Sequence, residues 1–337
     1  MTTEPTTIMA APTGQQERII ILDSLRGIAI LGILLMNIPG FGLPAPVSYG
    51  DLSVLNETGL NFKTWYFIDW FLEGSQRAIF SMLFGAGIIL FITRLEKRKD
   101  GLWPADYFFR RQLWLLVFGL FNAFVLLWFW DILFQYAICG MILFAFRRLS
   151  PKALIIGAVV CLFLQTARDN VSYYRDKNII RKGEMIAKID TTQTKLTAVQ
   201  KEQLAEFEGF KGKSSAENKK KDMEKSLRGM RGSYPELYAY QSERSYHGEV
   251  FYTYYALWDV LIFMMLGMAF FKNGVFLGNA PVKTYLFMFI IGLGGGLVLS
   301  WFRLQPMIDY NFNNYEITKN VKFQSYEISR TLRAIGI

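Results

Sequence analysis

Long apolar runs, each about as long as a bilayer is thick, recur along the chain and alternate with polar segments. A helix needs about 20 mostly apolar residues to cross the hydrocarbon core, and lipid cannot satisfy an open backbone. We therefore predict an all-α, polytopic membrane protein with about seven transmembrane helices. The predicted spans cover residues 19–39, 76–94, 112–130, 131–147, 151–167, 251–271 and 281–302.

Basic residues gather on one side of this pattern. The segment after the second span contains Arg94, Lys97, Arg98, Lys99, Arg110 and Arg111. Residues 40–66, between the first two spans, contain only Lys63. Short cytoplasmic loops carry an excess of Lys and Arg, so we expect a cytoplasmic N-terminus. Residues 1–18 are predicted to be a polar tail, without the basic start of a cleavable signal peptide.

Residues 168–250 form a long hydrophilic segment that this topology places outside the cell. Loops of this length cross the membrane largely regardless of their charge. Between Lys188 and Arg231 the sequence is rich in Lys, Glu, Gln and Ala, with Gly and Ser in the middle. This pattern predicts two solvated helices joined by a turn. Three interpretations of this segment stay open. It is a hydrophilic loop with no role in binding or catalysis, a cap over an external cavity, or an arm that binds a partner.

Composition supports the membrane class and excludes several kinds of site. Hydrophobic residues make up 52% of the chain and aromatic residues 16%, while the net charge of +9 is carried by loops and tails. Such flanking charge is typical of membrane topology, so we do not expect nucleic-acid binding. Cys139 and Cys161 lie inside predicted spans as small apolar residues. The sequence indicates no metal site and no nucleotide-binding or hydrolase motif.

The first span contains a charged pair within an otherwise lipid-like run. Asp23 and Arg26 are three positions apart, which places them within reach of each other on a helix. Asn37 projects within ~20° of Arg26 at about 100° per residue. Ionised groups at membrane depth are costly unless they are paired or face a protein-lined cavity. This polar stripe is therefore expected to face other helices.

Five further polar residues lie within the other spans or at their ends: Arg77, Arg111, Asn122, Asp131 and Asp259. They admit more than one interpretation. Polar contacts between membrane helices can simply fix the packing, with Arg77 bound to Asp131 or Asp259. They can also line a cavity for an anionic or hydroxylated substrate, or a proton or solute pathway.

Four segments carry a resemblance to a known family. They are ILDSLRGIAILGILLMNIPGFGLP (21–44), FSMLFGAGI (80–88), RRQLWLLVFGLF with DILFQYAICG (within 110–140), and WDVLIFMMLGMAFFKNGVF (258–276). In them the chain resembles the YeiB-like family of bacterial multipass inner-membrane proteins (domain of unknown function 418). The resemblance implies the bacterial inner membrane as location. It also suggests that SRTLRAIGI (329–337) begins a further membrane helix after a polar external segment, 303–328.

The LDSLRG opening is also similar to membrane acyltransferases of the heparan glucosaminide acetyltransferase type. This similarity implies acyl-coenzyme A as donor and an acceptor reached across the membrane, and a cell-envelope or lipid-linked acceptor is our prediction. Asp23 and His247, the only histidine, are then the candidate catalytic residues. The candidate substrate-binding residues are Arg26, Asn37, Arg77, Arg111, Asn122, Asp131 and Asp259.

Two features oppose this assignment and leave a second function open. His247 lies in a polar stretch outside the sixth span, where a lone histidine is typically a solvated residue. Relatives often have a histidine where this chain has Asn122, and an amide is not a base. The alternative is a transporter, or an accessory membrane component, that binds a small solute through the same charges. The expected partners are the lipid bilayer and a small-molecule or lipid-linked substrate, and the sequence indicates no oligomeric state.

Overall fold

The computed structural model describes residues 19–55, 58–190, 192 and 195–337, and within these ranges the regular secondary structure is helical. The predicted polar tail, 1–18, lies outside the described residues. The α-helices are α1 (Ile20–Gly42), α2 (Leu60–Leu72), α3 (Ser75–Arg98), α4 (Trp103–Phe124), α5 (Leu133–Phe146), α6 (Pro151–Ala187), α7 (Ala198–Lys213), α8 (Ala216–Arg231), α9 (Tyr234–Tyr246), α10 (Thr253–Lys272), α11 (Val282–Phe287), α12 (Gly295–Asp309), α13 (Asn314–Asn320) and α14 (Tyr326–Gly336).

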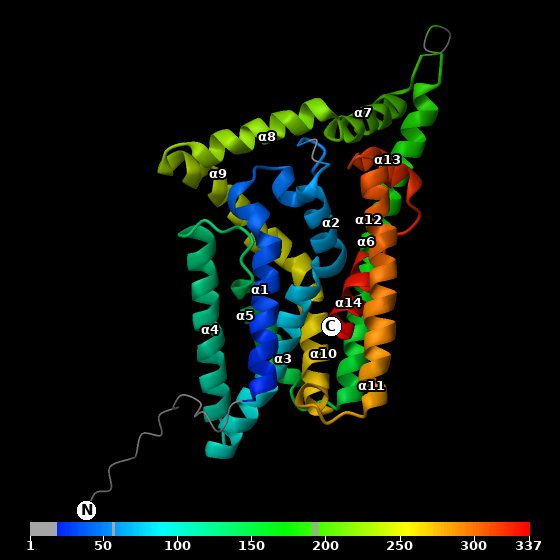
Figure 1. Ribbon diagram of the computed structural model, residues 1–337. Helices are drawn as coiled ribbons and strands as arrows, with labels where there is room; N and C mark the ends of the chain where they lie inside the picture. The colour runs from blue at the N-terminus through cyan, green and yellow to red at the C-terminus, as the bar shows by residue number, and fades with distance from the viewer. Residues whose placement is uncertain (1–18, 56–57, 191, 193–194) are drawn as a thin grey trace, which may run out of the picture.

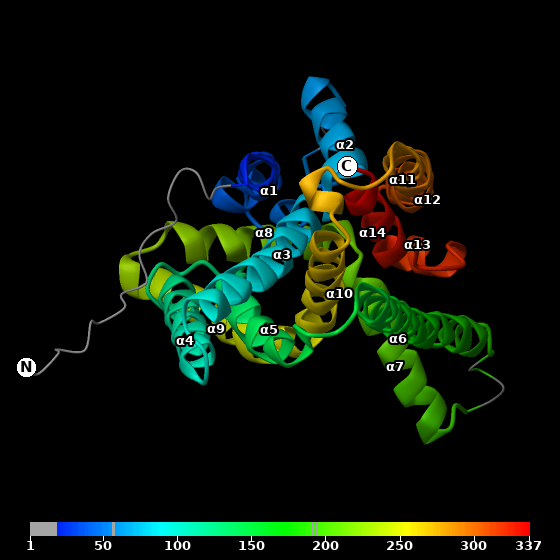
Figure 2. The same cartoon turned by 90° about the horizontal axis from the view of Figure 1, so that it is seen from below.

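The long helices stand side by side in one bundle, and α7 and α8 run across one end of it (Figure 1). We name the two ends after Figure 1. At the lower end α1 begins and α10 ends, and at the upper end α1 ends and α10 begins. Seen along its axis, the bundle has α3 and α10 at its centre, with α1, α5, α6 and α14 around them (Figure 2).

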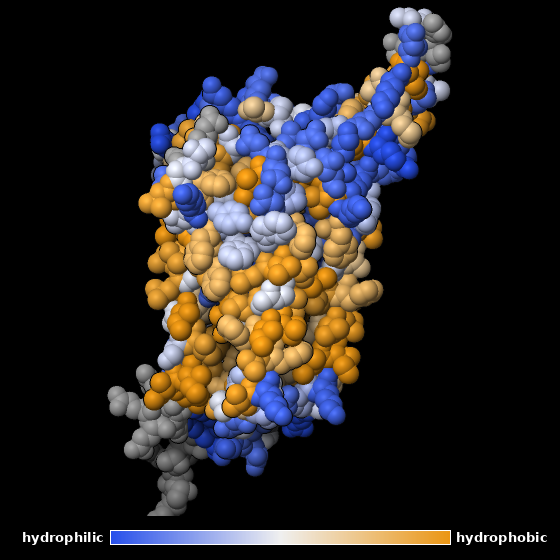
Figure 3. Space-filling view, turned by 45° about the vertical axis from the view of Figure 1, so that its right-hand side comes forward, coloured by the Kyte–Doolittle hydropathy of each residue, from blue (hydrophilic) through white to orange (hydrophobic). Residues whose placement is uncertain are grey.

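The chain is an all-α polytopic membrane protein. Five helical segments among the described residues are long and apolar enough to cross a bilayer: 20–42, 60–98, 151–187, 234–272 and 282–309. Hydrophobic side chains form a broad band between two hydrophilic ends (Figure 3). Helix α5 is also apolar but shorter. All seven predicted spans fall on helices, while the count of seven crossings and the cytoplasmic N-terminus stay predictions.

The predicted span 112–130 is wrong at its second end. Helix α4 ends at Phe124, and the chain then leaves the helical path, with Leu127 at a φ of 59°. Trp128 packs against Phe41 of α1 at 4.9 Å between ring centroids. The chain after α4 thus packs against a distant helix, a contact that hydropathy alone does not record. Helix α2, which lies between the first two predicted spans, was likewise not predicted.

Helices α3 and α10 cross at two glycines in the middle of the bundle. A Cβ atom on Gly85 would lie 2.1 Å from the carbonyl oxygen of Met264, and one on Gly267 would lie 1.8 Å from that of Met82. Small residues at such crossings let two backbones approach closely. The close approach of α3 and α10 therefore depends on Gly85 and Gly267.

The glycine-rich run of the last predicted span serves packing as well. A Cβ atom on Gly292 would lie 2.8 Å from the carbonyl oxygen of Leu332, and one on Gly296 would lie 2.6 Å from the backbone nitrogen of Arg333. Both glycines therefore accommodate α14. Residues 288–294 of this span form a π-helix, η5 (Met288–Gly294), between α11 and α12.

The hydrophilic segment contains the two predicted helices, α7 and α8, joined at Ser214 and Ser215. Thr197 caps α7 by accepting a hydrogen bond from the backbone of Gln200, and Ser215 caps α8. Helix α8 is attached to the bundle through Lys219. Its ammonium group lies 2.7 Å from a carboxylate oxygen of Asp51 and donates to the Phe312 carbonyl at 2.9 Å. The segment is thus packed across the upper end of the bundle (Figure 1).

Candidate functional site

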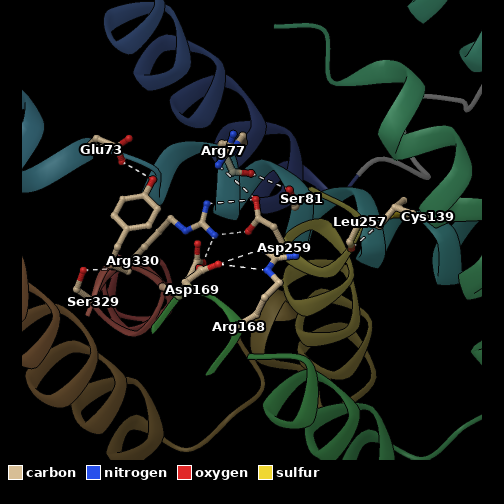
Figure 4. Close-up of polar contacts among 12 residues, drawn as sticks. Glu73, Arg77, Ser81, Cys139, Arg168, Asp169, Leu257, Asp259, Ser329 and Arg330 are labelled. Carbon is tan, nitrogen blue, oxygen red and sulfur yellow. Dashed lines mark hydrogen bonds and ion pairs between the residues drawn. The ribbon is translucent and has the colours of Figure 1, made fainter. Parts of the chain in front are cut away.

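Charged side chains from five helices meet inside the upper part of the bundle. We name this group the central charge cluster, and Figure 4 shows its members Glu73, Arg77, Asp259 and Arg330. It comprises Asp69 and Glu73 at the end of α2, Arg77 of α3, Asp259 of α10, Arg303 of α12, and Glu327, Arg330 and Arg333 of α14. Four carboxylates face four guanidinium groups, so the formal charges balance.

Arg330 is the centre of the cluster and is 1% exposed. Its guanidinium group binds both carboxylate oxygens of Asp259, one of them at 3.2 Å, and also binds Glu327. Arg77 approaches Asp259 from α3, with 3.3 Å between Nη2 and Oδ2. Two arginines therefore share one carboxylate, which joins α3, α10 and α14. Bidentate guanidinium–carboxylate pairs of this kind are among the stronger hydrogen-bonded contacts.

Arg333, the second arginine of α14, binds the chain where α2 ends and α3 begins. Gly74 has a φ of 71°, which separates the two helices. The last carbonyls of a helix have no partner within it. Arg333 supplies donors there, at 2.7 Å from the carbonyl oxygens of both Trp70 and Glu73. A Cβ atom on Gly74 would lie 2.3 Å from the Arg330 side chain, so glycine is also needed there for α14 to dock.

The structure selects one of the two partners that the sequence left open for Arg77. Arg77 pairs with Asp259, and Asp131 lies elsewhere. Most of the cluster's charges are buried and bound to one another, which is the arrangement of an interhelical contact. Arg77 differs, because 46% of its side chain is exposed whereas the side chain of Asp259 is 11% exposed. Among the paired charges of Arg77 and Asp259, Arg77 is therefore the more exposed one.

Sequence reasoning found Arg77 and Asp259 but missed the contribution of α14. In SRTLRAIGI the two arginines are three residues apart, and Glu327 precedes the first by three. This spacing puts all three side chains on one helical face. This spacing was a sequence signal for a charged face that contacts other helices. Our prediction for SRTLRAIGI was only that it begins a further membrane helix.

Asp23 and Arg26 form the predicted pair, at 3.0 Å, near the lower end of α1. Their side chains are 48% and 37% exposed, so the pair is not enclosed. Arg26 reaches over Gly87 of α3, where a Cβ atom would lie 3.3 Å from its Nη2. It also lies close enough to Arg111 of α4 for the two charges to repel each other. We name Arg26 and Arg111 the basic pair.

Arg111 lies over the ring of Phe91, with its guanidinium carbon 4.6 Å from the ring centroid. Within the described chain it forms no ion pair with a carboxylate. Asn122 is eleven residues further along α4, on the same face. At 1.5 Å per residue, the two positions are about 16 Å apart along the helix axis. Arg111 lies nearer the lower end of the bundle and Asn122 lies at the upper end (Figure 1).

Asn122 and Asp131 are brought together at the upper end of α4. The side-chain amide of Asn122 donates to Asp131 at 2.7 Å, and the backbone N–H of Phe134 donates to the other carboxylate oxygen at 2.9 Å. Asp131 is 4% exposed. These bonds hold the carboxyl group at the entrance of α5. Asn122 therefore orients a carboxyl group, a role that does not require a base.

The two candidate catalytic residues do not meet. Asp23 lies at the lower end, where Ile21 is close to Gly278, just after α10. His247 lies before α10, at the upper end, and α10 alone is about 30 Å long. The His247 side chain is exposed and packs against the ring of Phe251, 5.2 Å away. Asn37 is half-buried in the upper part of α1.

Among the described residues no group of three His, Cys, Asp or Glu side chains is arranged to hold a metal ion. Cys139 is buried, Cys161 is partly buried, and both are free thiols. Of the residues predicted to bind a substrate, we consider the basic pair, Arg77 and Asp131 further as ligand sites.

Three curated bacterial proteins are similar to part of the chain. "Uncharacterized protein YxaH" of Bacillus subtilis is 37% identical over 156 residues, which is 44% of this chain and 37% of the relative. The "Uncharacterized 39.9 kDa protein in amylase 3'region" of Bacillus acidopullulyticus is 34% identical over 154 residues, 45% and 41% of the two chains. "Uncharacterized protein YeiB" of Escherichia coli is 35% identical over 141 residues, 40% and 33%.

The matched region thus spans between a third and about two fifths of these relatives' lengths. No protein-family profile matches the chain, and no solved structure is significantly similar to it. The relatives' names support a likeness to YeiB-like proteins. They attach no reaction or substrate to it.

Proposed function

We propose that the protein transfers an acyl group from a coenzyme A thioester to a hydroxyl group of a cell-envelope or lipid-linked acceptor. The observation that carries the proposal is the arrangement of α4. One face of this helix presents a basic residue, Arg111, towards one end of the bundle and Asn122, bound to Asp131, at the other. Such an arrangement suits a donor and an acceptor that approach from opposite sides of a membrane.

The basic pair is the proposed site for the donor's phosphate groups. Guanidinium groups bind phosphate through two parallel hydrogen bonds. Arg26 and Arg111 repel each other in the absence of an anion, and Asp23 compensates only Arg26. With the predicted cytoplasmic N-terminus, the lower end faces the compartment that contains coenzyme A thioesters. The linear arm of the donor would then extend along α4 towards the upper end.

Asp131 is the proposed proton acceptor. The acceptor's hydroxyl oxygen attacks the thioester carbonyl carbon while the Asp131 carboxylate takes the hydroxyl proton. The tetrahedral intermediate then breaks its carbon–sulfur bond, which forms the new ester and releases the coenzyme A thiolate. The proton held by Asp131 then passes to that thiolate, which leaves as the thiol and restores the Asp131 carboxylate. Asn122 is a positioning residue, since its amide holds the carboxyl group by the bond at 2.7 Å.

The donor site is tested by ligand-induced thermal stabilisation of the detergent-purified protein. Acetyl- and longer-chain acyl-coenzyme A at 100 times their dissociation constant should stabilise the native state by about 2.7 kcal/mol. We expect Arg111→Gln to abolish the increase in melting temperature, because it removes one guanidinium group of the basic pair. Arg110→Gln is the matched control, since Arg110 is the adjacent residue and pairs with Asp106 on the surface of α4.

An increase that persists in Arg111→Gln would reject the basic pair as the donor site. Absence of any increase with all thioesters, in protein that still melts cooperatively, would reject acyl transfer from coenzyme A.

A second function, transport of a small anion, is favoured by one observation. Arg77 is half exposed although its partner Asp259 is buried, and we propose that a solute binds to this exposed part of the guanidinium side chain. In proteoliposomes, uptake of inorganic phosphate or small carboxylates should then be lost in Arg77→Gln. Uptake equal to that of protein-free liposomes would exclude these anions as substrates.

A further inference from the structure

A second buried carboxyl group lies beside Asp131. Glu249 belongs to a π-helical segment, η3 (His247–Tyr252), which connects α9 to α10. It is 3% exposed, and neither of its carboxylate oxygens has a hydrogen-bond partner within the described chain. Asp131 is the charged group close enough to act on it electrostatically. π-Helical segments of this kind are frequent at functional sites.

The position of Glu249 is held by close contacts with the end of α4 and the link that follows it. The hydroxyl group of Ser245 donates to the carbonyl oxygen of Ala123 at 2.7 Å. A Cβ atom on Gly248 would lie 2.9 Å from the carbonyl oxygen of Phe129, two residues before Asp131. The segment therefore packs directly on the chain that carries Asp131, which brings the buried carboxyl group of Glu249 near the buried carboxyl group of Asp131.

No nearby cation among the described residues neutralises this pair. Arg244 of α9 lies over the Phe129 ring at 4.1 Å, and it binds Gln241 at 3.2 Å and the hydroxyl groups of two tyrosines, Tyr49 and Tyr240. The exposed His247 ring packs on Phe251. The acid within α10, Asp259, is already paired with arginines of the central charge cluster. The donors to Asp131 are the Asn122 amide and the backbone of Phe134, and they do not reach Glu249.

Two ionised carboxylates cannot both be stable here. Burial without a partner disfavours an ionised acid, and a second negative charge nearby adds to this cost. A bound metal ion would remove the charge, but the described residues offer no third acidic, histidine or cysteine ligand. A single proton removes both costs, because one carboxyl group becomes neutral. Asp131 accepts two hydrogen bonds and Glu249 none, so the proton belongs on Glu249.

We propose that Asp131 and Glu249 form a proton-binding site, in which Glu249 is protonated and Asp131 is ionised at neutral pH. The site stands on burial and on missing counter-charges, and it does not depend on the proposed acyl transfer. Its ligand is a proton exchanged at the upper end of the bundle. In either function considered above, the site would supply or take up that proton.

Infrared difference spectroscopy of the lipid-reconstituted protein tests this site, because a protonated carboxyl group has a carbonyl band separate from that of a carboxylate. We expect such a band at neutral pH, its loss as the pH rises, and its absence in Glu249→Gln. Glu243→Gln, which removes an exposed acid of α9, is the control and should retain the band. Asp131→Asn removes the neighbouring negative charge, so the band should disappear at a lower pH than in the unchanged protein.

Thermal unfolding provides a second measurement. If Glu249 is protonated in the native state and ionised in the unfolded state, the native state binds more protons, and stability decreases as pH rises. As the pH rises from mildly acidic values to the pH at which the infrared band disappears, the melting temperature of the unchanged protein should therefore decrease more than that of Glu249→Gln. A neutral-pH spectrum unaltered by Glu249→Gln would overturn the proposal. So would loss of the band on adding sodium chloride at constant pH, which would indicate a cation site.

Discussion

Replacing Arg330 with methionine should lower the free energy of unfolding by about 3–5 kcal/mol, the cost of breaking a buried ion pair from one side. Arg330 is 1% exposed and binds Asp259 and Glu327 at once. Methionine would fill much of the volume while leaving both carboxyl groups without this partner. The unpaired charges, and not lost packing, are the expected cause.

Thermal or denaturant unfolding in detergent measures this effect. Arg228→Met is the matched control, because Arg228 forms an exposed pair with Glu224 on α8, and exposed pairs contribute about 0–1 kcal/mol. The double variant Arg330→Met with Asp259→Asn should recover part of the loss, since it also removes a negative charge. Equal stability of Arg330→Met and Arg228→Met would show that the central charge cluster does not hold the bundle together.

Gly267→Ala should destabilise the bundle by about 3 kcal/mol or more, at or beyond the upper range for overpacking. The added Cβ atom would lie 1.8 Å from the Met82 carbonyl oxygen, which belongs to the backbone of α3. A side chain can rotate away from such a contact, whereas a helix backbone cannot. We therefore expect α3 and α10 to separate and the central packing to be lost.

The measurement is the melting temperature and the yield of monodisperse protein in detergent. Gly27→Ala is the control, because a Cβ atom on this glycine of α1 meets nothing within 4 Å. It should leave both quantities unchanged or slightly improved, since alanine favours the helix. If the two alanine variants behave alike, the crossing of α3 and α10 tolerates a wider separation than this structure has.

The sequence predicted ion pairs between residues that are close together in the chain. The pairing of Asp23 with Arg26 follows from helical spacing alone, and it is confirmed at 3.0 Å. The pairing of Arg77 could be narrowed only to two acids, because both lie at suitable depth on other helices. The structure selects Asp259, at 3.3 Å, and adds Arg330 as a further partner.

Of the two neighbouring acids, Asp131 and Glu249, the sequence indicated only Asp131. Asp131 stood out because it interrupts an apolar run. Glu249 lies in a polar stretch, ERSYHGEVF, where an acid is unremarkable in the sequence and only His247 was a candidate site residue. Burial of Glu249 results from the packing of η3 on the link after α4, and no pattern within either segment encodes that contact.

By itself the sequence determined the helical class, the membrane environment, and where the apolar helices lie. In lipid, each spanning segment must be apolar and must satisfy its own backbone hydrogen bonds, so these properties can be read from each segment separately. The tertiary structure decided where α4 ends, how α14 enters the bundle through Arg330 and Arg333, and which carboxyl groups lack a counter-charge. These properties depend on contacts between residues far apart in the chain. The energy of a buried charge is set by the partner that packing brings to it, and not by its neighbours in sequence.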